Sequence, residues 1–403
     1  MRAINLIAVF LTGALLIGCG STQVVRTPTP LQAGVPSQGF ELLWQLNIGK
    51  MDEADGRGLN LASDSQRLFV AGTSGRLTAL WKQPKSRYQD QVIWQIQFEP
   101  RIISGPVLSG NRLIVGTSKG DVLMLSAENG ELLWQTRLNS EVVSQPVLTD
   151  DRVFVRTNDG RVVALNLQTG ETIWAADHQM PNLFLRGAAP VLLDGDSLFV
   201  GRESGVLEAL SVQNGSKQWD VRIAAPKGRT DLERMVDLQS KLILDSGRLL
   251  VLGYNGQLAS INPKTGNFQW TKELTGYRDM LLHDRVLYVI DENDILRALD
   301  PASGTEYWVQ NGFKFRQTAQ VEADQLNPTQ IRVTDGLGFV HWLNAKDGGF
   351  IARFKHADHL NDGEKMMHWL QEQDKHYVLD SDGNITAYQQ TTRPGGSAAG
   401  QNQ

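Results

Sequence analysis

This sequence of 403 residues has one cysteine and no large excess of either charge. The single cysteine, Cys19, lies near the N-terminus, so the rest of the chain has neither an internal disulfide nor a thiolate metal cage. Basic and acidic residues nearly balance, 39 against 44, which gives a formal net charge of −5. Because nucleic-acid binding requires a positive field, this balance argues against a dedicated nucleic-acid-binding protein.

The N-terminus has the features of a secretory signal peptide. Arg2 precedes an apolar run from Ile4 to Ile17, which is shorter than the roughly 20 residues that a comfortable membrane span needs. The stretch Leu16–Cys19 resembles a bacterial lipobox, in which the cysteine is acylated and becomes the new N-terminus. We therefore expect residues 1–18 to be a lipoprotein signal peptide and Cys19 to be lipidated. The alternative is a plain secretory signal with an incidental cysteine.

Short polar segments flank the repeating part of the chain. Gly20 and Ser21 follow the cysteine, at a place where an aspartate would retain a lipoprotein in the inner membrane. By resemblance to known sorting rules, the sequence implies that the protein is anchored to the outer membrane of a diderm bacterium and faces the periplasm. Residues 19–39 contain Gly, Ser and Pro and predict a flexible tether, and residues 391–403 predict a disordered tail. Cleavage of the signal removes the charge of Arg2 and leaves a net charge of −5 − 1 = −6.

A unit of about 40 residues recurs along the chain. The stretch Gly120–Trp134 matches Gly160–Trp174 position for position, with an offset of 40 residues. Further copies end in Trp94, Trp219, Trp270 and Trp308, and a weaker copy has Ala352 where the tryptophan is expected. A fixed period in this range is typical of a repeat architecture.

Each unit contains short strands separated by tight turns. Strands such as Arg152–Val155 and Arg248–Val251 are apolar at consecutive positions, so both of their faces must be covered, as happens when small sheets stack. Turns such as Asp159–Gly160 tolerate the positive φ that hairpins need. Each unit therefore predicts a four-stranded antiparallel meander, and no helical period of comparable length competes.

The two ends of the repeating region decide between an open solenoid and a closed ring. The last unit stops at Tyr388 without a fourth strand, and an orphan fourth strand, Glu41–Trp44, stands at the beginning. Joining them completes an eighth unit and leaves no end sheet exposed. Residues 40–390 then give about 44 residues per blade. We predict an all-β fold: an eight-bladed β-propeller of four-stranded antiparallel blades, closed by the N-terminal strand.

The side chains that carry chemistry form no catalytic constellation. One tryptophan per unit is explained by packing between neighbouring sheets. The repeat resembles that of pyrroloquinoline-quinone dehydrogenases, but the single cysteine excludes the cysteine pair common beside their quinone. The one candidate metal cluster, better explained as a solvated loop, comprises His356, His359, Glu364 and His368. We predict no catalytic residue, no cofactor and no metal site.

Departures from the repeat length locate candidate binding loops. Extra residues lie within one unit, at Trp81–Gln91, and between units, at 175–187 and 221–238. Connections between units of a meander all emerge on one face, so the last two insertions are neighbours. The first of them contains Leu183–Arg186, where successive apolar side chains precede an arginine, a frequent interface anchor. This indicates a protein-binding site; a segment that caps a blade or begins a core strand is the alternative.

The lipobox, the Pro-containing tether, the eight quinoprotein-type repeats and the Leu-x-Leu-Arg loop together resemble the BamB family of outer-membrane assembly lipoproteins, over residues 16–390. In that family the Leu-x-Leu-Arg loop and a following Asp-x-Asp loop bind a periplasmic POTRA domain of BamA, the central subunit of the β-barrel assembly machinery. The resemblance implies partner-binding roles for Leu183, Leu185, Arg186 and Asp237. Gln239 stands at the second acidic position, so a charge that the family uses is missing.

The resemblance implies a non-enzymatic scaffold that supports the insertion of outer-membrane proteins. Unfolded outer-membrane proteins are a further candidate partner, because the free edges of outer strands could pair with them, although every propeller has such edges. A periplasmic quinone-dependent dehydrogenase or another propeller binding module is the alternative.

Overall fold

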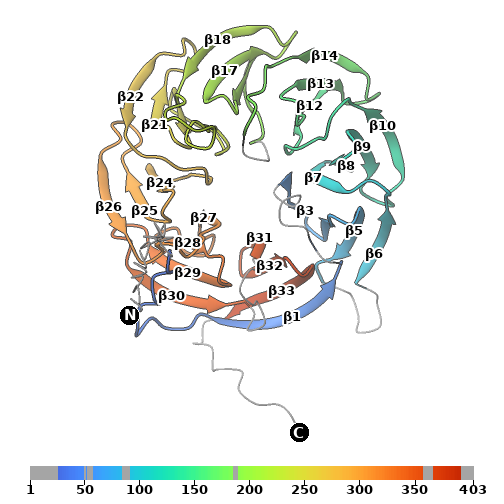
Figure 1. Cartoon of the computed structure of the whole chain (residues 1–403). Coiled ribbons are helices and arrows are strands. Elements are labelled where there is room, and N and C mark those ends of the chain that lie inside the picture. The colour runs from blue at the N-terminus through green and yellow to red at the C-terminus, as the bar shows by residue number, and fades with distance from the viewer. Residues whose placement is uncertain are drawn as a thin grey trace, which may run out of the picture.

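The computed structural model of the chain describes residues 26–49, 51, 58–83, 91–184, 189–356 and 366–391. These residues form thirty-three β-strands and, within those ranges, no helix. The described part of the chain accordingly contains no helix long and apolar enough to cross a membrane. The strands lie in eight sheets around a central axis (Figure 1), so the predicted eight-bladed β-propeller is confirmed.

The blades follow one another along the chain, and within each complete blade the first strand lies nearest the axis (Figure 1). Blades 1 to 4 comprise β3 (Leu61–Ser63), β4 (Arg67–Ala71), β5 (Arg76–Trp81) and β6 (Val92–Gln97); β7 (Ile102–Ser109), β8 (Arg112–Thr117), β9 (Asp121–Ser126) and β10 (Leu132–Arg137); β11 (Val147–Leu148), β12 (Arg152–Arg156), β13 (Val162–Asn166) and β14 (Thr172–Ala176); and β15 (Leu192–Asp194), β16 (Ser197–Gly201), β17 (Val206–Ser211) and β18 (Lys217–Arg222).

The second half of the ring repeats this pattern until the last blade. Blades 5 to 7 comprise β19 (Ile243–Asp245), β20 (Arg248–Leu252), β21 (Leu258–Ile261) and β22 (Phe268–Lys272); β23 (Leu281–His283), β24 (Val286–Ile290), β25 (Leu296–Leu299) and β26 (Glu306–Gln310); and β27 (Gln320–Ala323), β28 (Gln330–Thr334), β29 (Phe339–Asn344) and β30 (Phe350–Lys355). Blade 8 comprises β31 (Met366–Glu372), β32 (Lys375–Asp380), β33 (Asn384–Thr391) and β1 (Gly39–Asn47).

The N-terminal strand closes the ring as predicted. β1 pairs antiparallel with β33 from Gly39, opposite Thr391, to Asn47, opposite Asn384. Beyond it, the N–H of Ile48 donates to the Gly383 carbonyl at 2.8 Å. A short strand that follows, β2 (Gly58–Leu59), joins blade 2 by pairing in parallel with β7. The N-terminal strand β1 and the C-terminal strand β33 therefore share one sheet, and each of the eight blades has at least four strands.

Apolar clusters fill the space between successive blades. The two middle strands of most blades are buried on both sides, as their consecutive apolar residues predict. Between blades 2 and 3, for example, Met124 of β9 packs in one cluster with Val153 and Leu165 of β12 and β13. Burial of apolar surface on both sides of each sheet is the main driving force for stacking the blades.

The repeated tryptophans join each blade to the next. In seven copies the indole N–H donates to a backbone carbonyl of the following blade, at 3.0–3.1 Å. The pairs are Trp44 with Lys82, Trp94 with Ala127, Trp134 with Leu167, Trp174 with Val212, Trp219 with Pro263, Trp270 with Pro301 and Trp308 with Ala345. Blade 7 has Ala352 in this place. There a cluster of aromatic rings packs instead. The ring centroid of Phe40 lies 4.4 Å from that of Phe354 and 5.8 Å from that of Trp342.

The repeated glycine of the Gly-x-x-x-Trp motif serves the same junction. Gly170 has φ +73°, and a Cβ atom there would lie 2.6 Å from the ring of Trp134 in the preceding blade. Glycine alone satisfies both the left-handed backbone and the close approach of the indole. Six of the eight junctions have this contact between a glycine and a tryptophan in the described residues, so the period seen in the sequence is the period of the junctions.

We expect Trp270→Phe to lower the free energy of unfolding by about 1–2 kcal/mol, because the Pro301 carbonyl loses its indole partner inside the junction. Tyr307→Phe is the matched control. It also removes one polar hydrogen from an aromatic ring on an outer strand, but its side chain is exposed, and we expect a change below about 0.5 kcal/mol. Urea unfolding measures both. Equal stability of Trp270→Phe and the wild type would contradict the role of the indole.

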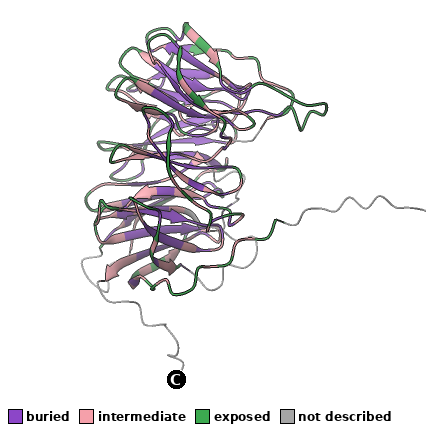
Figure 2. Ribbon diagram, turned by 90° about the vertical axis from the view of Figure 1, so that its left-hand side faces the viewer, coloured by how far each residue is buried: buried purple, intermediate pink, exposed green. Residues whose placement is uncertain are grey.

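The propeller has two different faces. The connections between blades and the turns between second and third strands emerge on one face, which we call the loop face; the remaining turns form the turn face. The connection between blades 4 and 5 projects furthest from the loop face (Figure 2). The first described residues of the chain lie on the same side (Figure 2).

Residues 26–38, assigned by the sequence to a flexible tether, lie against blade 7. The Thr29 N–H donates to the Lys314 carbonyl at 2.9 Å, and Arg316 donates to the Thr29 carbonyl at 2.9 Å. Further on, Gln38 and Pro36 exchange backbone hydrogen bonds with Arg353, at the outer edge of β30. The described part of the expected tether therefore packs on the propeller, because polar backbone groups find partners there. Residues 19–25, including Cys19, lie outside the described residues.

Candidate protein-docking face

The described residues offer little that suits catalysis or metal binding. Within this part of the chain no group of three His, Cys, Asp or Glu side chains could hold a metal ion. A cavity of about 470 Å³ opens between blades 8 and 1. Its charged groups serve the closure of the ring: Lys82 is ion-paired with Glu372, which also accepts from the Ser63 hydroxyl at 2.6 Å. His359 and Glu364 of the rejected metal cluster lie outside the described residues.

The connection between blades 3 and 4 carries the first predicted binding loop. Leu183 is 44% exposed, and Phe184 beside it is half-buried. Leu185 and Arg186, the other two predicted contacts in this loop, lie outside the described residues. The described part of the loop thus presents one large apolar side chain to solvent on the loop face, which is where the spacing of the repeats placed it.

One end of this loop is held by a buried ion pair. Arg156, at the end of β12, is 1% exposed; it donates to the Ala189 carbonyl at 3.1 Å and to Glu203 at 2.8 Å. Ala189 is the first described residue after Leu185 and Arg186. A guanidinium that binds a carboxylate and a carbonyl at once fixes the loop end in both position and direction.

The other end is held by a second charged cluster. His178 lies 3.5 Å from Glu208, and Glu208 accepts from Arg202 at 2.8 Å. Burial alone would raise the pKa of Glu208, but the hydrogen bond with His178 and the charge of Arg202 outweigh it and lower that pKa to about 2. Arg161 adds a surface ion pair with Asp177 at 2.7 Å. Both ends of the loop are therefore tied to the two blades beneath it.

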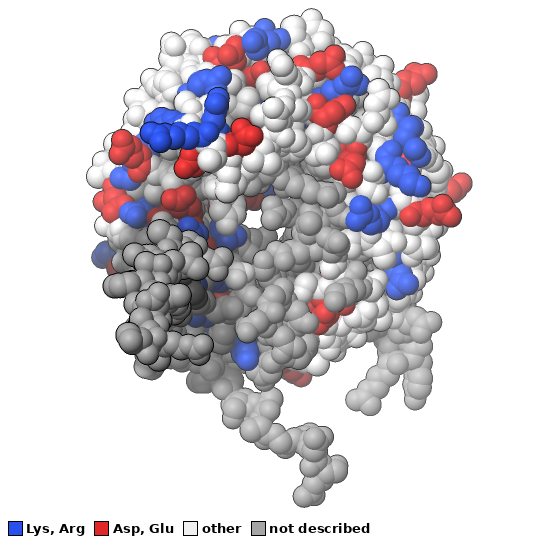
Figure 3. Space-filling model, in the orientation of Figure 1, with Lys and Arg blue, Asp and Glu red and all other residues white. Residues whose placement is uncertain are grey.

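The connection between blades 4 and 5 forms a protruding tip with its own internal hydrogen bonds. Glu233 accepts from the N–H groups of Arg229 and Thr230 at 2.7 and 3.1 Å, and its own N–H donates to the Thr230 hydroxyl at 3.2 Å. This is the reciprocal arrangement of a capping box. Leu232, between them, is 68% exposed. Basic side chains gather over this region of the loop face (Figure 3).

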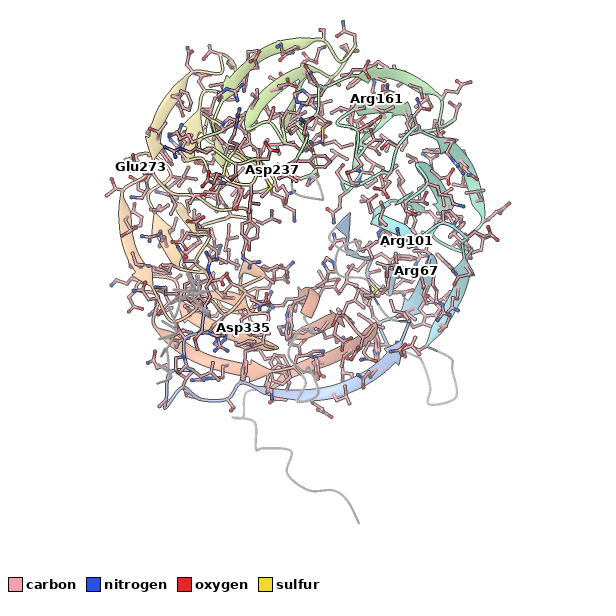
Figure 4. The ribbon with its side chains drawn as sticks, in the orientation of Figure 1. Arg67, Arg101, Arg161, Asp237, Glu273 and Asp335 are labelled. Carbon is pink, nitrogen blue, oxygen red and sulfur yellow. The ribbon has the colours of Figure 1, made fainter. Side chains whose placement is uncertain are left out.

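Asp237, the predicted contact in this second loop, lies at its base and is 1% exposed. Its backbone N–H and carbonyl both pair with Tyr254, at 3.4 and 2.8 Å. Figure 4 shows it toward the inside of the ring. Direct partner contact by Asp237 stays a prediction; its buried position suits a residue that positions the loop. Gln239, at the missing acidic position, is half-buried.

Sequence reasoning missed Arg156 and Arg202, which support the first loop. The signal was present: each arginine directly follows the apolar run of a second strand, Arg156 after Val153–Val155 and Arg202 after Leu198–Gly201, in the two blades that flank the insertion. Lys and Arg are almost never fully buried unless they are paired. An arginine at a core position beside an insertion therefore indicates a loop anchored from below.

A family model described as "Outer membrane protein assembly factor BamB" matches residues 83–310. A protein of that description from Legionella pneumophila (strain Paris) is 38% identical over 332 residues, which are 81% of this chain and 84% of the relative. The chain belongs to the BamB family. The resemblance drawn from the repeats and the lipobox is thereby confirmed.

Solved structures similar to this BamB-family chain agree on the fold. The crystal structure of BamB from Moraxella catarrhalis has a TM-score of 0.74 at 23% identity and covers 87% of this chain and all of that chain. A quinohemoprotein alcohol dehydrogenase from Comamonas testosteroni has a TM-score of 0.66 at 11% identity, over 89% of this chain and 78% of that one. The family is one of assembly factors, so the chain is not an enzyme, and the dehydrogenase shares its fold alone.

Proposed function

We propose that the chain is a scaffold lipoprotein of the β-barrel assembly machinery, held by acylated Cys19 at the periplasmic face of the outer membrane. Its part in outer-membrane protein assembly follows from its family. The finer proposal is that the loop face binds a POTRA domain of BamA through Leu183, Leu185 and Arg186. Asp237 acts in this proposal by holding the second loop in place.

The observation that carries the proposal is an exposed apolar residue on a loop with braced ends. Leu183 is exposed, and the ends of its loop are fixed by buried charged groups, Arg156 at one side and the cluster of Arg202, Glu208 and His178 at the other. Binding to a fixed loop costs less conformational entropy than binding to a mobile one. An apolar side chain flanked by an arginine is a typical hot spot of a protein interface.

We expect Leu183→Asp and Arg186→Ala each to weaken binding of a soluble POTRA fragment of BamA by about 30-fold or more, since a hot spot contributes about 2 kcal/mol or more. Isothermal titration calorimetry on the purified proteins measures the affinity. Leu326→Asp is the matched control: Leu326 is 48% exposed but lies on the turn face. Its affinity should equal that of the wild type. Unchanged binding by Leu183→Asp and Arg186→Ala would refute the assigned interface.

A further inference from the structure

Positive charge gathers where the N-terminal segment meets blade 7 on the loop face. Four of the basic side chains lie over two aromatic rings. Arg26 and Lys314 lie over Phe315, at 5.6 and 5.1 Å from its centroid. Arg316 and Lys355 lie over Phe339 in the same way, at 5.7 and 5.9 Å. We call this set, with the neighbouring guanidinium that donates to the Gln32 carbonyl, the basic corner: Arg26, Lys314, Arg316, Arg353 and Lys355.

The buried carboxylate of Asp335 neutralises the charge of Arg316. Asp335 accepts from Arg316 at 2.8 Å and lies 3.1 Å from His341, and it is fully buried beneath the corner. Figure 4 shows it in the same blade, inward of β30. Burial and the neighbouring charge of Arg316 together lower the pKa of Arg353. Arg316 and Arg353 are thus close enough to repel each other, and Arg26, Lys314 and Lys355 are exposed to solvent.

The turn that presents Phe315 has an unusual backbone. Phe315 and Gln317 have φ values of +60° and +57°, which are uncommon for residues with large side chains. Neighbouring groups fix them: the Phe315 N–H donates to the Asn293 carbonyl at 3.2 Å, and the Gln317 N–H donates to Asp294 at 2.9 Å. Backbone strain that the surroundings hold in place is concentrated at functional sites. Here it holds a half-exposed ring against two cations.

The place of this corner along the chain points to its occupant. Arg26 follows Cys19 by 26 − 19 = 7 residues. Seven residues span at most about 25 Å even when fully extended. If Cys19 carries the lipid anchor, the basic corner stays within this distance of the membrane surface for as long as residues 26–38 remain on blade 7. The negatively charged groups always within reach are then the phosphates of the lipid headgroups.

We propose that the basic corner binds phosphate groups of lipid headgroups in the leaflet that holds the anchor. The acyl chains attach the protein, and the corner turns one side of the loop face toward the membrane. Each basic residue close to an anionic surface strengthens binding by about fivefold, and the effect decays within a Debye length of about 8–10 Å. The inference uses the acylation of Cys19 from the proposed function, but its test does not require the acyl group.

The test uses the mature chain made without its signal peptide and with Cys19→Ser, so that no lipid is attached. None of the removed or changed residues belongs to the described structure. Sedimentation with vesicles measures binding to phosphatidylcholine alone and to phosphatidylcholine mixed with phosphatidylglycerol. We expect binding only to the mixed vesicles, and weaker binding at higher salt. Because the mature chain has a net charge of −6, its overall charge opposes this binding, and a local cationic surface must overcome it.

Two double variants with the same charge change separate the corner from general electrostatics. Arg26→Ser with Lys314→Ser should lower the partition coefficient on the mixed vesicles by about 30-fold. Lys264→Ser with Lys346→Ser, on exposed turns of the turn face, should lower it by less than about twofold. Absence of wild-type binding, equal binding to both vesicle types, or equal losses in the two variants would each overturn the proposal.

A second readout separates this inference from the proposed function. Both double variants should bind the POTRA fragment with wild-type affinity, because Leu183 and Arg186 are unchanged. If the wild-type chain fails to bind the POTRA fragment but binds mixed vesicles through Arg26 and Lys314, the proposed function fails and the lipid-binding surface stands. The reverse result rejects the lipid-binding surface alone.

Discussion

Arg156→Met is expected to lower the free energy of unfolding by about 3–5 kcal/mol, the range for breaking one half of a buried ion pair. The side chains of Arg156 and Glu203 are both almost fully buried, 2.8 Å apart. Removing the guanidinium takes the hydrogen-bonded counter-charge from the Glu203 carboxylate and leaves it with the charge of Arg202, and the Ala189 carbonyl loses its donor. Urea unfolding gives the stability. Binding of the POTRA fragment should also weaken, since the end of the Leu183 loop is released.

A double variant and a surface pair serve as controls for this prediction. Arg156→Met with Glu203→Gln removes the buried charge that has lost its ion-pair partner and should recover most of the stability, but not the hydrogen bond to Ala189. Lys217→Met breaks the exposed pair with Asp220 and should cost less than about 1 kcal/mol. A loss below 1 kcal/mol for Arg156→Met would mean that water reaches this pair, contrary to its burial. Recovery of partner binding in the double variant would show that Arg156 stabilises without positioning the loop.

The architecture could be predicted because the repeat encodes a local contact. Among the described residues, six of the eight junctions combine a tryptophan with a glycine that accepts its ring, such as Trp134 and Gly170, and these residue types are rare enough to reveal their period. The closure was predictable for the same reason, since Trp44 is one more copy of the tryptophan. Ala352 marked the junction where the pattern fails, and there the structure has an aromatic cluster with Phe40 in its place.

The docking of the N-terminal segment could not be predicted from composition. Residues 26–38 contain few apolar side chains, and their contacts with blade 7 are largely hydrogen bonds to Lys314, Arg316 and Arg353. Such bonds depend on the backbone of a partner far away in sequence, which leaves no periodic signal. The burial of Asp237 was hidden for a similar reason: it depends on pairing with Tyr254, in the turn of the next blade.

The closing blade contains a histidine that must stay neutral. His376 on β32 accepts from the Trp369 indole at 3.0 Å, and its other ring nitrogen lies 2.9 Å from the Gln390 amide oxygen. The ring of Phe40, from the N-terminal strand β1, packs edge-on at 4.9 Å. Burial, and next the charge of Arg332, lower the pKa of His376 from 6.5 to about 3. Protonation would place a cation inside the blade in which β1 joins β31, β32 and β33.

This histidine should make the propeller acid-sensitive. Between pH 6.5 and about 3 the unfolded chain binds a proton at His376 that the folded chain excludes, so stability falls as the pH falls through this window. Between pH 7.5 and 4.5, only the two pH units below 6.5 change the free energy of unfolding, and they lower it by about 3 kcal/mol. His376→Gln has no proton to gain, so the stability of this variant should fall by about 3 kcal/mol less than that of the wild type in urea unfolding at the two pH values.

Glu208→Gln provides the control, because the carboxylate of Glu208 affects stability in a different pH range. The lowered pKa of Glu208 contributes stability that is present above pH 4.5 and lost only as the pH falls toward about 2. Glu208→Gln should therefore be less stable than the wild type at both pH 7.5 and 4.5, with the wild-type difference between them. If His376→Gln kept the full wild-type difference, His376 would already be charged in the folded chain. The acid sensitivity would then have to arise elsewhere than at the closure.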